Sequence, residues 1–328
     1  MENPLHPIFL ELKYYQFEII VLNCMDFVKA FKIYSLQQKM MTKGTKIMDK
    51  FHEKPNVFVG EVTIKVQDLE KATAFYQEII GFQLLKKEDK KVILTANGQT
   101  PLLTLEQPAH VFPKEKRALG LYHFAILLPT REDLSQFLRH IIQVGYPIGA
   151  ADHDVSEALY LNDPDGNGIE VYRDRPSSQW TWNNGLVHMV TEQLDGDGIL
   201  AESSKSWGGL PKNTIMGHIH LHVADVKKAE EFYTKGLGFN VVSYYPQAAF
   251  LSTGNYHHHI AVNMWQGANA QVPSKNSVGL KWYTLVYPNE AERQAVVERL
   301  KQLGAPVRKE EEFYTTEDPT GNQIKLVI

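Results

Sequence analysis

Residues 217–226 read Gly-His-Ile-His-Leu-His-Val-Ala-Asp-Val, and residues 60–69 read Gly-Glu-Val-Thr-Ile-Lys-Val-Gln-Asp-Leu, at an offset of 157 residues. In both copies polar and apolar residues alternate, which predicts a strand, and an Asp follows where it can cap the start of a helix. The same offset relates the Phe-Tyr pair at 75–76 to the pair at 232–233. The chain therefore contains an internal repeat.

A second pair of repeats lies after these two stretches. Residues 120–128 predict a strand, 132–144 a helix that ends at a Gly, and 160–172 two strands joined by an Asp-Pro-Asp-Gly-Asn turn. A matching copy runs from Gly279 to the Asp-Pro-Thr-Gly-Asn turn at 318–322. We therefore expect four modules of about fifty residues, each reading β-α-β-β-β, and an α+β fold.

The repeats divide the chain into domains and connecting segments. The predicted units are an N-terminal extension at 1–50, a first domain at 57–173 (modules 57–107 and 119–173), a linker at 174–214 without sustained periodicity, and a second domain at 215–328 (modules 215–266 and 276–328). The extension fits no module, so we expect residues 1–47 to be an upstream translation artefact or a disordered tail. Met48 or another internal methionine is then the natural start.

The composition narrows the classes of protein. The 328 residues have 34 Lys and Arg against 38 Asp and Glu, so no basic excess favours nucleic acid. The single Cys24 forms no internal disulfide, and no apolar run approaches the length of a membrane span. We therefore expect a cytoplasmic protein without nucleic acid or membrane partners, and leave a homo-oligomer open. The 13 histidines are the unusual feature, since histidine is the commonest metal ligand.

Three strings carry a resemblance to a known family: GHIHLHV at 217–223, DPDGNGIE at 163–170 and YHHHIAVN at 256–263. Together with the four βαβββ modules, they resemble the vicinal oxygen chelate superfamily, which includes glyoxalases and extradiol dioxygenases. Within it the chain is most similar to catechol 2,3-dioxygenases of the bacillus type. The resemblance implies that modules pair into two cup-shaped mixed β halves, and that a metal binds to side chains of first and last strands.

The family's ligand positions can be located in this chain. The first-strand positions of the four modules hold Glu61, His123, His218 and Trp282, and the last-strand positions of modules two and four hold Glu170 and Lys325. If modules paired in sequence order, modules three and four would offer His218 with Trp282 and Lys325. These three residues cannot form a set of two histidines and one carboxylate. If modules two and three pair, His123, His218 and Glu170 converge. We favour this second pairing, with modules one and four forming a metal-free cup.

The resemblance also implies catalytic and substrate-binding residues. His258 matches the position of the catalytic acid/base, although a slip of one residue would place His257 or His259 there. We expect these three histidines to alternate faces of a strand. Tyr160 matches a substrate-contacting Tyr, and His153 is the nearest candidate for its His partner, at a spacing two residues shorter than in the family. His220 and His257 are the predicted substrate-binding residues.

With these residues at the family's positions, the resemblance implies an extradiol dioxygenase. The expected metal is iron(II), with manganese(II) as the alternative, and the expected reactants are a catechol-type small molecule and O2, giving a 2-hydroxymuconic semialdehyde. One rival function is a glyoxalase-like isomerase or lyase, whose sites have four protein ligands, including a carboxylate from each of two modules. The other rival is a metal-free protein that binds an aromatic or quinone compound.

Overall fold

The computed structural model describes residues 50–267 and 269–328. Of the predicted N-terminal extension at 1–50, residues 1–49 lie outside this part, and with them the expectation for residues 1–47. Among the described residues, no helix is both long enough and apolar enough to cross a membrane.

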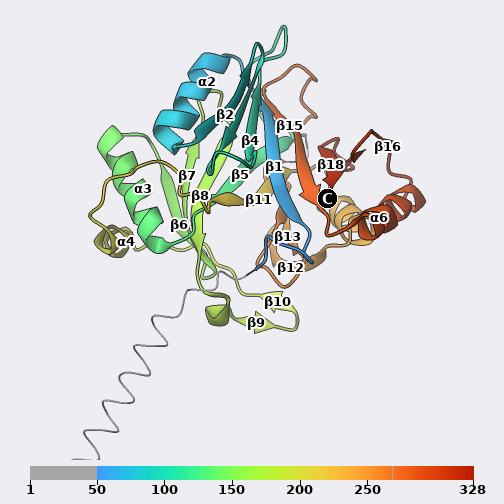
Figure 1. The fold of residues 1–328 in the computed structure, drawn as a ribbon. Helices are drawn as coiled ribbons and strands as arrows, with labels where there is room; N and C mark the ends of the chain where they lie inside the picture. Colours follow the sequence, from blue (N-terminus) through green and yellow to red (C-terminus); the bar gives the residue numbers. More distant parts are fainter. Residues whose placement is uncertain (1–49, 268) are drawn as a thin grey trace, which may run out of the picture. The chain divides into compact units, whose positions relative to one another are not determined.

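Two eight-stranded mixed sheets form the framework of the described fold (Figure 1). The first, here called the 1/4 sheet, has the order β16-β17-β18-β15-β1-β4-β3-β2, and the second, the 2/3 sheet, has the order β12-β13-β14-β11-β5-β8-β7-β6. The 1/4 strands are β1 (Phe58–Lys65), β2 (Gln83–Glu88), β3 (Lys91–Thr95), β4 (Leu103–Glu106), β15 (Gly279–Val286), β16 (Val307–Lys309), β17 (Tyr314–Glu317) and β18 (Gln323–Val327). The 2/3 strands are β5 (Gly120–Leu127), β6 (Gly149–Asp152), β7 (Ser156–Asn162), β8 (Gly168–Asp174), β11 (Ile215–His222), β12 (Asn240–Tyr245), β13 (Ala248–Ser252) and β14 (Ile260–Asn263).

The sheet order shows how the four modules pair. β5 of module two pairs antiparallel with β11 of module three, and β1 of module one pairs antiparallel with β15 of module four. This is the pairing that the ligand positions favour. The α+β class with repeated modules is confirmed, and the two sheets share one continuous apolar core to which all four modules contribute.

Each module carries one helix between its first and second strands. These helices are α2 (Leu69–Phe75), α3 (Arg131–Val144), α5 (Val226–Glu231) and α6 (Glu290–Gln302). The predicted caps form, because the Asp68 and Asp225 carboxylates accept the backbone N–H groups of Lys71 and Lys228. Both α2 and α5 continue into a single π-helical turn, at Tyr76–Ile80 and Phe232–Gly236, and the two turns are shifted by one residue relative to the repeat.

The two Asp-Pro-x-Gly-Asn turns form as predicted and also join modules. The Asp163 carboxylate accepts the backbone N–H groups of Asp165 and Asn167 at 2.9 and 2.8 Å, which closes the turn. The buried Tyr76 of module one donates its hydroxyl hydrogen to the same carboxylate at 2.9 Å. Module three repeats this contact, since Tyr233 donates to Asp318 of module four at 3.1 Å. Each turn therefore anchors the helix of another module.

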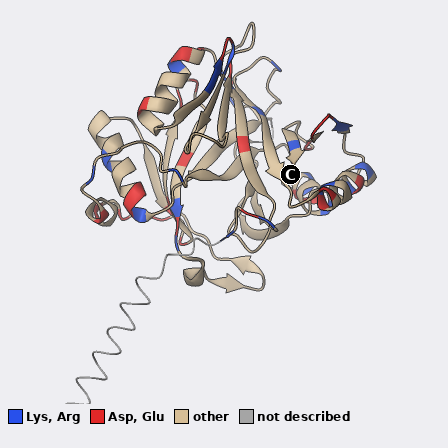
Figure 2. Ribbon diagram, in the orientation of Figure 1, with Lys and Arg blue, Asp and Glu red and all other residues tan. Residues whose placement is uncertain are grey.

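The linker at 174–214 is more ordered than its sequence predicts. It holds a 3-10 turn (Ser177–Gln179), the short pair β9 (Trp182–Asn183) and β10 (Leu186–Val187), and α4 (Gly196–Glu202). Its backbone also contacts module two, because Val190 accepts a hydrogen bond from His153. Charged residues of both signs are interspersed along α2, α3 and α6 (Figure 2), in keeping with the small net charge.

Candidate metal centre

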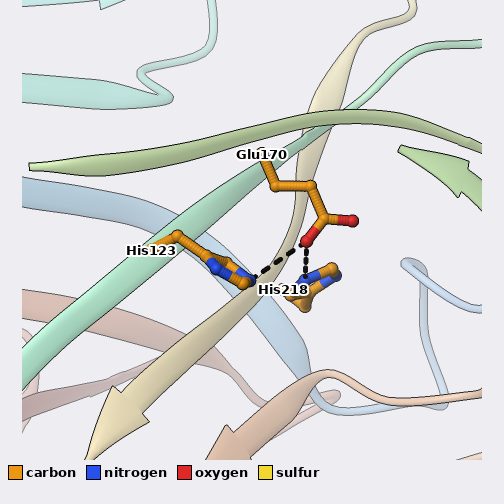
Figure 3. A group of neighbouring side chains, drawn as sticks. All are labelled: His123, Glu170 and His218. Carbon is orange, nitrogen blue, oxygen red and sulfur yellow. Dashed lines mark hydrogen bonds and ion pairs between the residues drawn. The ribbon is translucent and has the colours of Figure 1, made fainter. Parts of the chain in front are cut away.

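Three predicted ligands lie on adjacent strands in the middle of the 2/3 sheet. His123 is on β5, Glu170 on β8 and His218 on β11, and their side chains point toward one another (Figure 3). The Nε2 atoms of His123 and His218 lie 3.0 and 3.1 Å from the same Glu170 oxygen, Oε2. All three residues are buried. Among the described residues, their donor atoms form a group whose members lie within 4.8 Å of one another.

The strand register explains this convergence. Ala125 of β5 is paired with Glu170 on one side and with His218 on the other, so these three side chains share one face of the sheet. His123 precedes Ala125 by two residues and therefore faces the same way. The small Ala125 side chain leaves the space between the two ligands open. A one-residue slip of any strand would separate the set.

The protonation states of Glu170 and His218 suit a cation. Burial opposes charge on Glu170, but the contacts with His218 and His123 outweigh it and hold the pKa of the Glu170 carboxyl well below its ordinary value. Burial lowers the pKa of His218 to about 4, although Glu170 partly opposes this shift. The set therefore offers a carboxylate and at least one neutral imidazole near pH 7, which are the forms that bind metal.

The donor set fits a divalent metal. His123 Nε2 lies at ion-pair distance from Glu170 but has no hydrogen-bond partner, and Nδ1 of His123 and of His218 also lack one. A buried polar atom without a partner is costly, and a metal ion between the two Nε2 atoms and the carboxylate would satisfy those facing it. Two histidines and one carboxylate form the facial set typical of iron(II) oxygenases, which leaves positions open for other ligands.

Tyr160 and His153 lie beside this set. Tyr160 of β7 pairs in register with Glu170, and its ring lies 5.6 Å from the His123 ring. His153 donates from Nδ1 to the Val190 carbonyl at 2.6 Å, so its Nε2 accepts the Tyr160 hydroxyl hydrogen at 2.7 Å. Burial and the nearby Glu170 charge raise the pKa of Tyr160 well above its ordinary value, so this group stays protonated.

His257, His258 and His259 do not lie on a strand, and the expected alternation of faces is wrong. They form the bend before β14, so strand pleating does not apply. His257 and His258 contact each other through their Nδ1 atoms at 2.8 Å. His259 lies apart from this pair and contacts the Phe51 carbonyl through Nε2 at 3.1 Å. The His258 ring packs 4.0 Å from the His218 ring, so His258 is the member of the run that lies against the ligand set.

Both ring nitrogens of His257 are already engaged by the protein. Its Nε2 contacts Asp174 Oδ1 at 2.8 Å and its Nδ1 contacts His258, and the residue is fully buried. A direct contact between His257 and substrate is therefore not what this geometry favours. Asp174 was not predicted from the sequence. A usable signal existed, since Asp174 follows Glu170 by four residues and so faces the same side of β8.

His220 forms part of an aromatic wall next to the ligand set. Its ring lies 5.0 Å from His123 and 5.3 Å from Trp265, and its Nε2 accepts from the Asn263 amide at 2.8 Å. Tyr122 packs 5.0 Å from His220 and, like Trp265, is partly exposed. Sequence reasoning missed Tyr122 and Trp265, because an aromatic residue in a strand pattern indicates core packing as readily as a binding wall.

The equivalent positions of the 1/4 sheet hold a different chemistry. The Lys325 ammonium lies 3.6 Å from the centre of the Trp282 ring, and the Glu61 carboxylate accepts a hydrogen bond from Thr104. A lysine and a tryptophan thus stand where the 2/3 sheet has Glu170 and a histidine. The metal-free character of this cup remains a prediction.

Fold and ligand set together define a class of protein. The family model described as the Glyoxalase/Bleomycin resistance protein/Dioxygenase superfamily matches residues 59–171 and 215–326. The chain belongs to this superfamily.

One relative of known name is similar over most of the chain. The "Catechol-2,3-dioxygenase" of Bacillus subtilis (strain 168) is 45% identical over 287 residues, which cover 86% of this chain and all of the relative. Among solved structures, glyoxalase I from Zea mays has a TM-score of 0.53 at 17% identity, covering 83% of this chain and 92% of its own. A Bacillus subtilis structure has a TM-score of 0.57 at 12% identity, covering 83% and 85%. These two structures show the fold alone.

Proposed function

We propose that this protein is an extradiol dioxygenase that cleaves catechol or a substituted catechol next to its two hydroxyl groups, giving a 2-hydroxymuconic semialdehyde. The observation that carries the proposal is the convergence of His123, His218 and Glu170, with His258 packed against the set. The name of the 45% identical relative supports catechol as the substrate class. We infer that the enzyme works in the cytoplasm on this small molecule and O2, and we leave a homo-oligomer open.

Iron(II) is the metal we propose, held by His123, His218 and Glu170, with manganese(II) as the alternative. When bound, the metal would acidify a catechol hydroxyl and bring catechol and O2 together. Side chains of the protein then accept and return the substrate proton. Burial and the neighbouring histidines keep the pKa of His258 well below its ordinary value, so its neutral ring can accept the substrate proton. Tyr160, hydrogen-bonded to His153, lies next to Glu170, whereas His258 packs against His218. The two groups therefore flank the ligand set.

The wall of His220, Tyr122 and Trp265 would pack against the substrate ring and limit water. The overall step is balanced by the two substrates alone, since both oxygen atoms of O2 enter the product. The proton taken by His258 is returned when the ring opens.

No observation favours a glyoxalase-like reaction. The position on β14 that corresponds to Glu170 on β8 is Ala261, because Ala261 pairs with His220 as Glu170 pairs with Ala125. Alanine has no donor atom, so module three supplies no carboxylate at the position where module two supplies Glu170. A glyoxalase-like site would need a carboxylate from each of the two modules.

The test is turnover by iron(II)-loaded protein. The protein is reconstituted without oxygen, mixed with catechol and O2, and the product is followed by mass and absorbance. We expect a yellow product equal in mass to catechol plus O2, and the His258→Gln variant is expected to keep iron but lose about 10²-fold or more in kcat. A colourless product, or no ring cleavage of several catechols by protein that contains iron, would contradict the proposal.

A further inference from the structure

A buried hydrogen-bonded chain leads away from His258. His258 Nδ1 contacts His257 Nδ1 at 2.8 Å, and His257 Nε2 contacts Asp174 Oδ1 at 2.8 Å. Asp174 ends β8 of module two, while the histidines precede β14 of module three. The chain Asp174–His257–His258 therefore joins the two modules that supply the metal ligands.

The Asp174 carboxylate determines which ring nitrogens of His257 and His258 carry hydrogen. The Asp174 carboxylate oxygen accepts this bond, so His257 Nε2 donates to it. A neutral imidazole carries hydrogen on one nitrogen, which leaves His257 Nδ1 as an acceptor. The contact between the two Nδ1 atoms then requires His258 Nδ1 to donate. His258 Nε2 is left with the free lone pair.

We propose that Asp174 and His257 are positioning residues that hold His258 in the one neutral form whose Nε2 atom can accept a proton from substrate. This inference rests on the proposed role of His258 as the base. It also gives His257 a role that does not require contact with substrate. Neither residue is a member of the ligand set.

Aromatic side chains pack around the hydrogen-bonded series Asp174–His257–His258. The His257 ring lies 4.1 Å from the Tyr256 ring and 5.2 Å from the Trp180 ring, and His257 is fully buried. The Tyr256 hydroxyl also donates to Asp174 Oδ1, at 3.3 Å, and lies 2.6 Å from the Tyr172 hydroxyl. Asp174 Oδ1 therefore accepts a second hydrogen bond besides the one from His257. Among the described residues, the contact with His257 is the hydrogen bond that His258 makes, so its Nε2 remains available.

Substitutions can separate tautomer control from packing. His257→Leu removes the acceptor for His258 Nδ1. Asp174→Asn keeps the shape but supplies an amide N–H that can donate to His257 Nε2, which allows the opposite arrangement of hydrogens. His257→Gln retains one donor and one acceptor and should behave more like the wild type than His257→Leu does. The matched control is His259→Leu, since His259 is equally buried but bonds to the Phe51 carbonyl instead.

The first measurement is nitrogen NMR of histidine-labelled, metal-free protein, with the His258 signals identified by their loss in His258→Gln. We expect His258 to carry hydrogen on Nδ1 and none on Nε2 in the wild type and in His259→Leu. In His257→Leu and Asp174→Asn we expect a mixture of both forms or the opposite form. Hydrogen on Nε2 in the wild type, or an unchanged pattern in both variants, would overturn the inference.

The second measurement is turnover by iron(II)-loaded protein. His257→Leu and Asp174→Asn are expected to keep iron and to lose about tenfold or more in kcat, with a change in KM below about threefold. The control His259→Leu is expected to retain kcat. Equal kcat losses in His257→Leu and His259→Leu would assign the effect to packing and overturn the inference. Absence of ring cleavage by the wild type would contradict the proposed function. The NMR measurement alone would then decide whether Asp174 and His257 set the tautomer of His258.

Discussion

Glu170 is the residue on which the metal centre depends most. It supplies the only carboxylate of the ligand set, and both histidines lie within 3.1 Å of its Oε2 atom. We predict that Glu170→Gln lowers iron(II) affinity by about 10²-fold or more, since even changes outside the ligand shell cost 10- to 100-fold. The control is Glu61→Gln in the 1/4 cup, which should bind iron like the wild type. Metal titration of the apo-proteins checks this, and equal loss in both variants would place the metal elsewhere.

At the scale of single elements, the helix-to-turn contact should carry measurable stability. Tyr76→Phe deletes the buried hydroxyl and leaves Asp163 short of a donor, so we predict a loss of about 1–3 kcal/mol in the free energy of unfolding. Tyr244→Phe is the control, because its hydroxyl donates to Glu230 at an exposed site. Denaturant unfolding checks the pair. Equal small effects would show that the buried contact contributes no more than a surface one.

The same elements show how far the sequence can predict the fold. Turns and caps were predictable, because Asp68, Asp225 and the Asp-Pro-x-Gly-Asn strings act through their immediate neighbours in the chain. The ligand set followed from the repeat and the resemblance, once module pairing was chosen. The bend at 257–259 was not predictable from strand periodicity. The positions of its histidines depend on contacts with residues far away in the sequence, Asp174 and Phe51. The order of the linker likewise depends on contacts with module two.

At the scale of the whole molecule, buried histidines make stability depend on pH. Burial lowers the pKa values of His218 and His222 to about 4, below the ordinary value of 6.5. Between these values the unfolded chain binds more protons than the fold, so stability must fall as pH drops from about 6.5 toward 4. Each histidine can contribute up to about 3 kcal/mol.

We therefore predict that the unfolding free energy of metal-free protein decreases steadily between pH 7 and pH 5. His222→Gln, which replaces a titrating ring by a neutral amide, should make this decrease shallower. Denaturant unfolding at pH 7, 6 and 5 provides the measurement. A flat profile would show that these histidines are not held neutral by the fold.

The four modules also suggest how the molecule is organised. We propose that residues 57–173 and 215–328 are two duplicated sequence units whose modules exchange partners, so that each sheet takes one module from each unit. The 2/3 sheet then collects His123, Glu170 and His218 in one cup, while Lys325 and Trp282 occupy the other cup. One metal per chain follows from this arrangement.

The most direct test of this account is the location of iron in crystals grown without oxygen from iron(II)-loaded protein, read from anomalous diffraction at the iron edge. We predict one peak per chain, bonded to His123, His218 and Glu170, and none beside Lys325. A peak in the 1/4 cup, or one that lacks any of the three predicted ligands, would contradict the account.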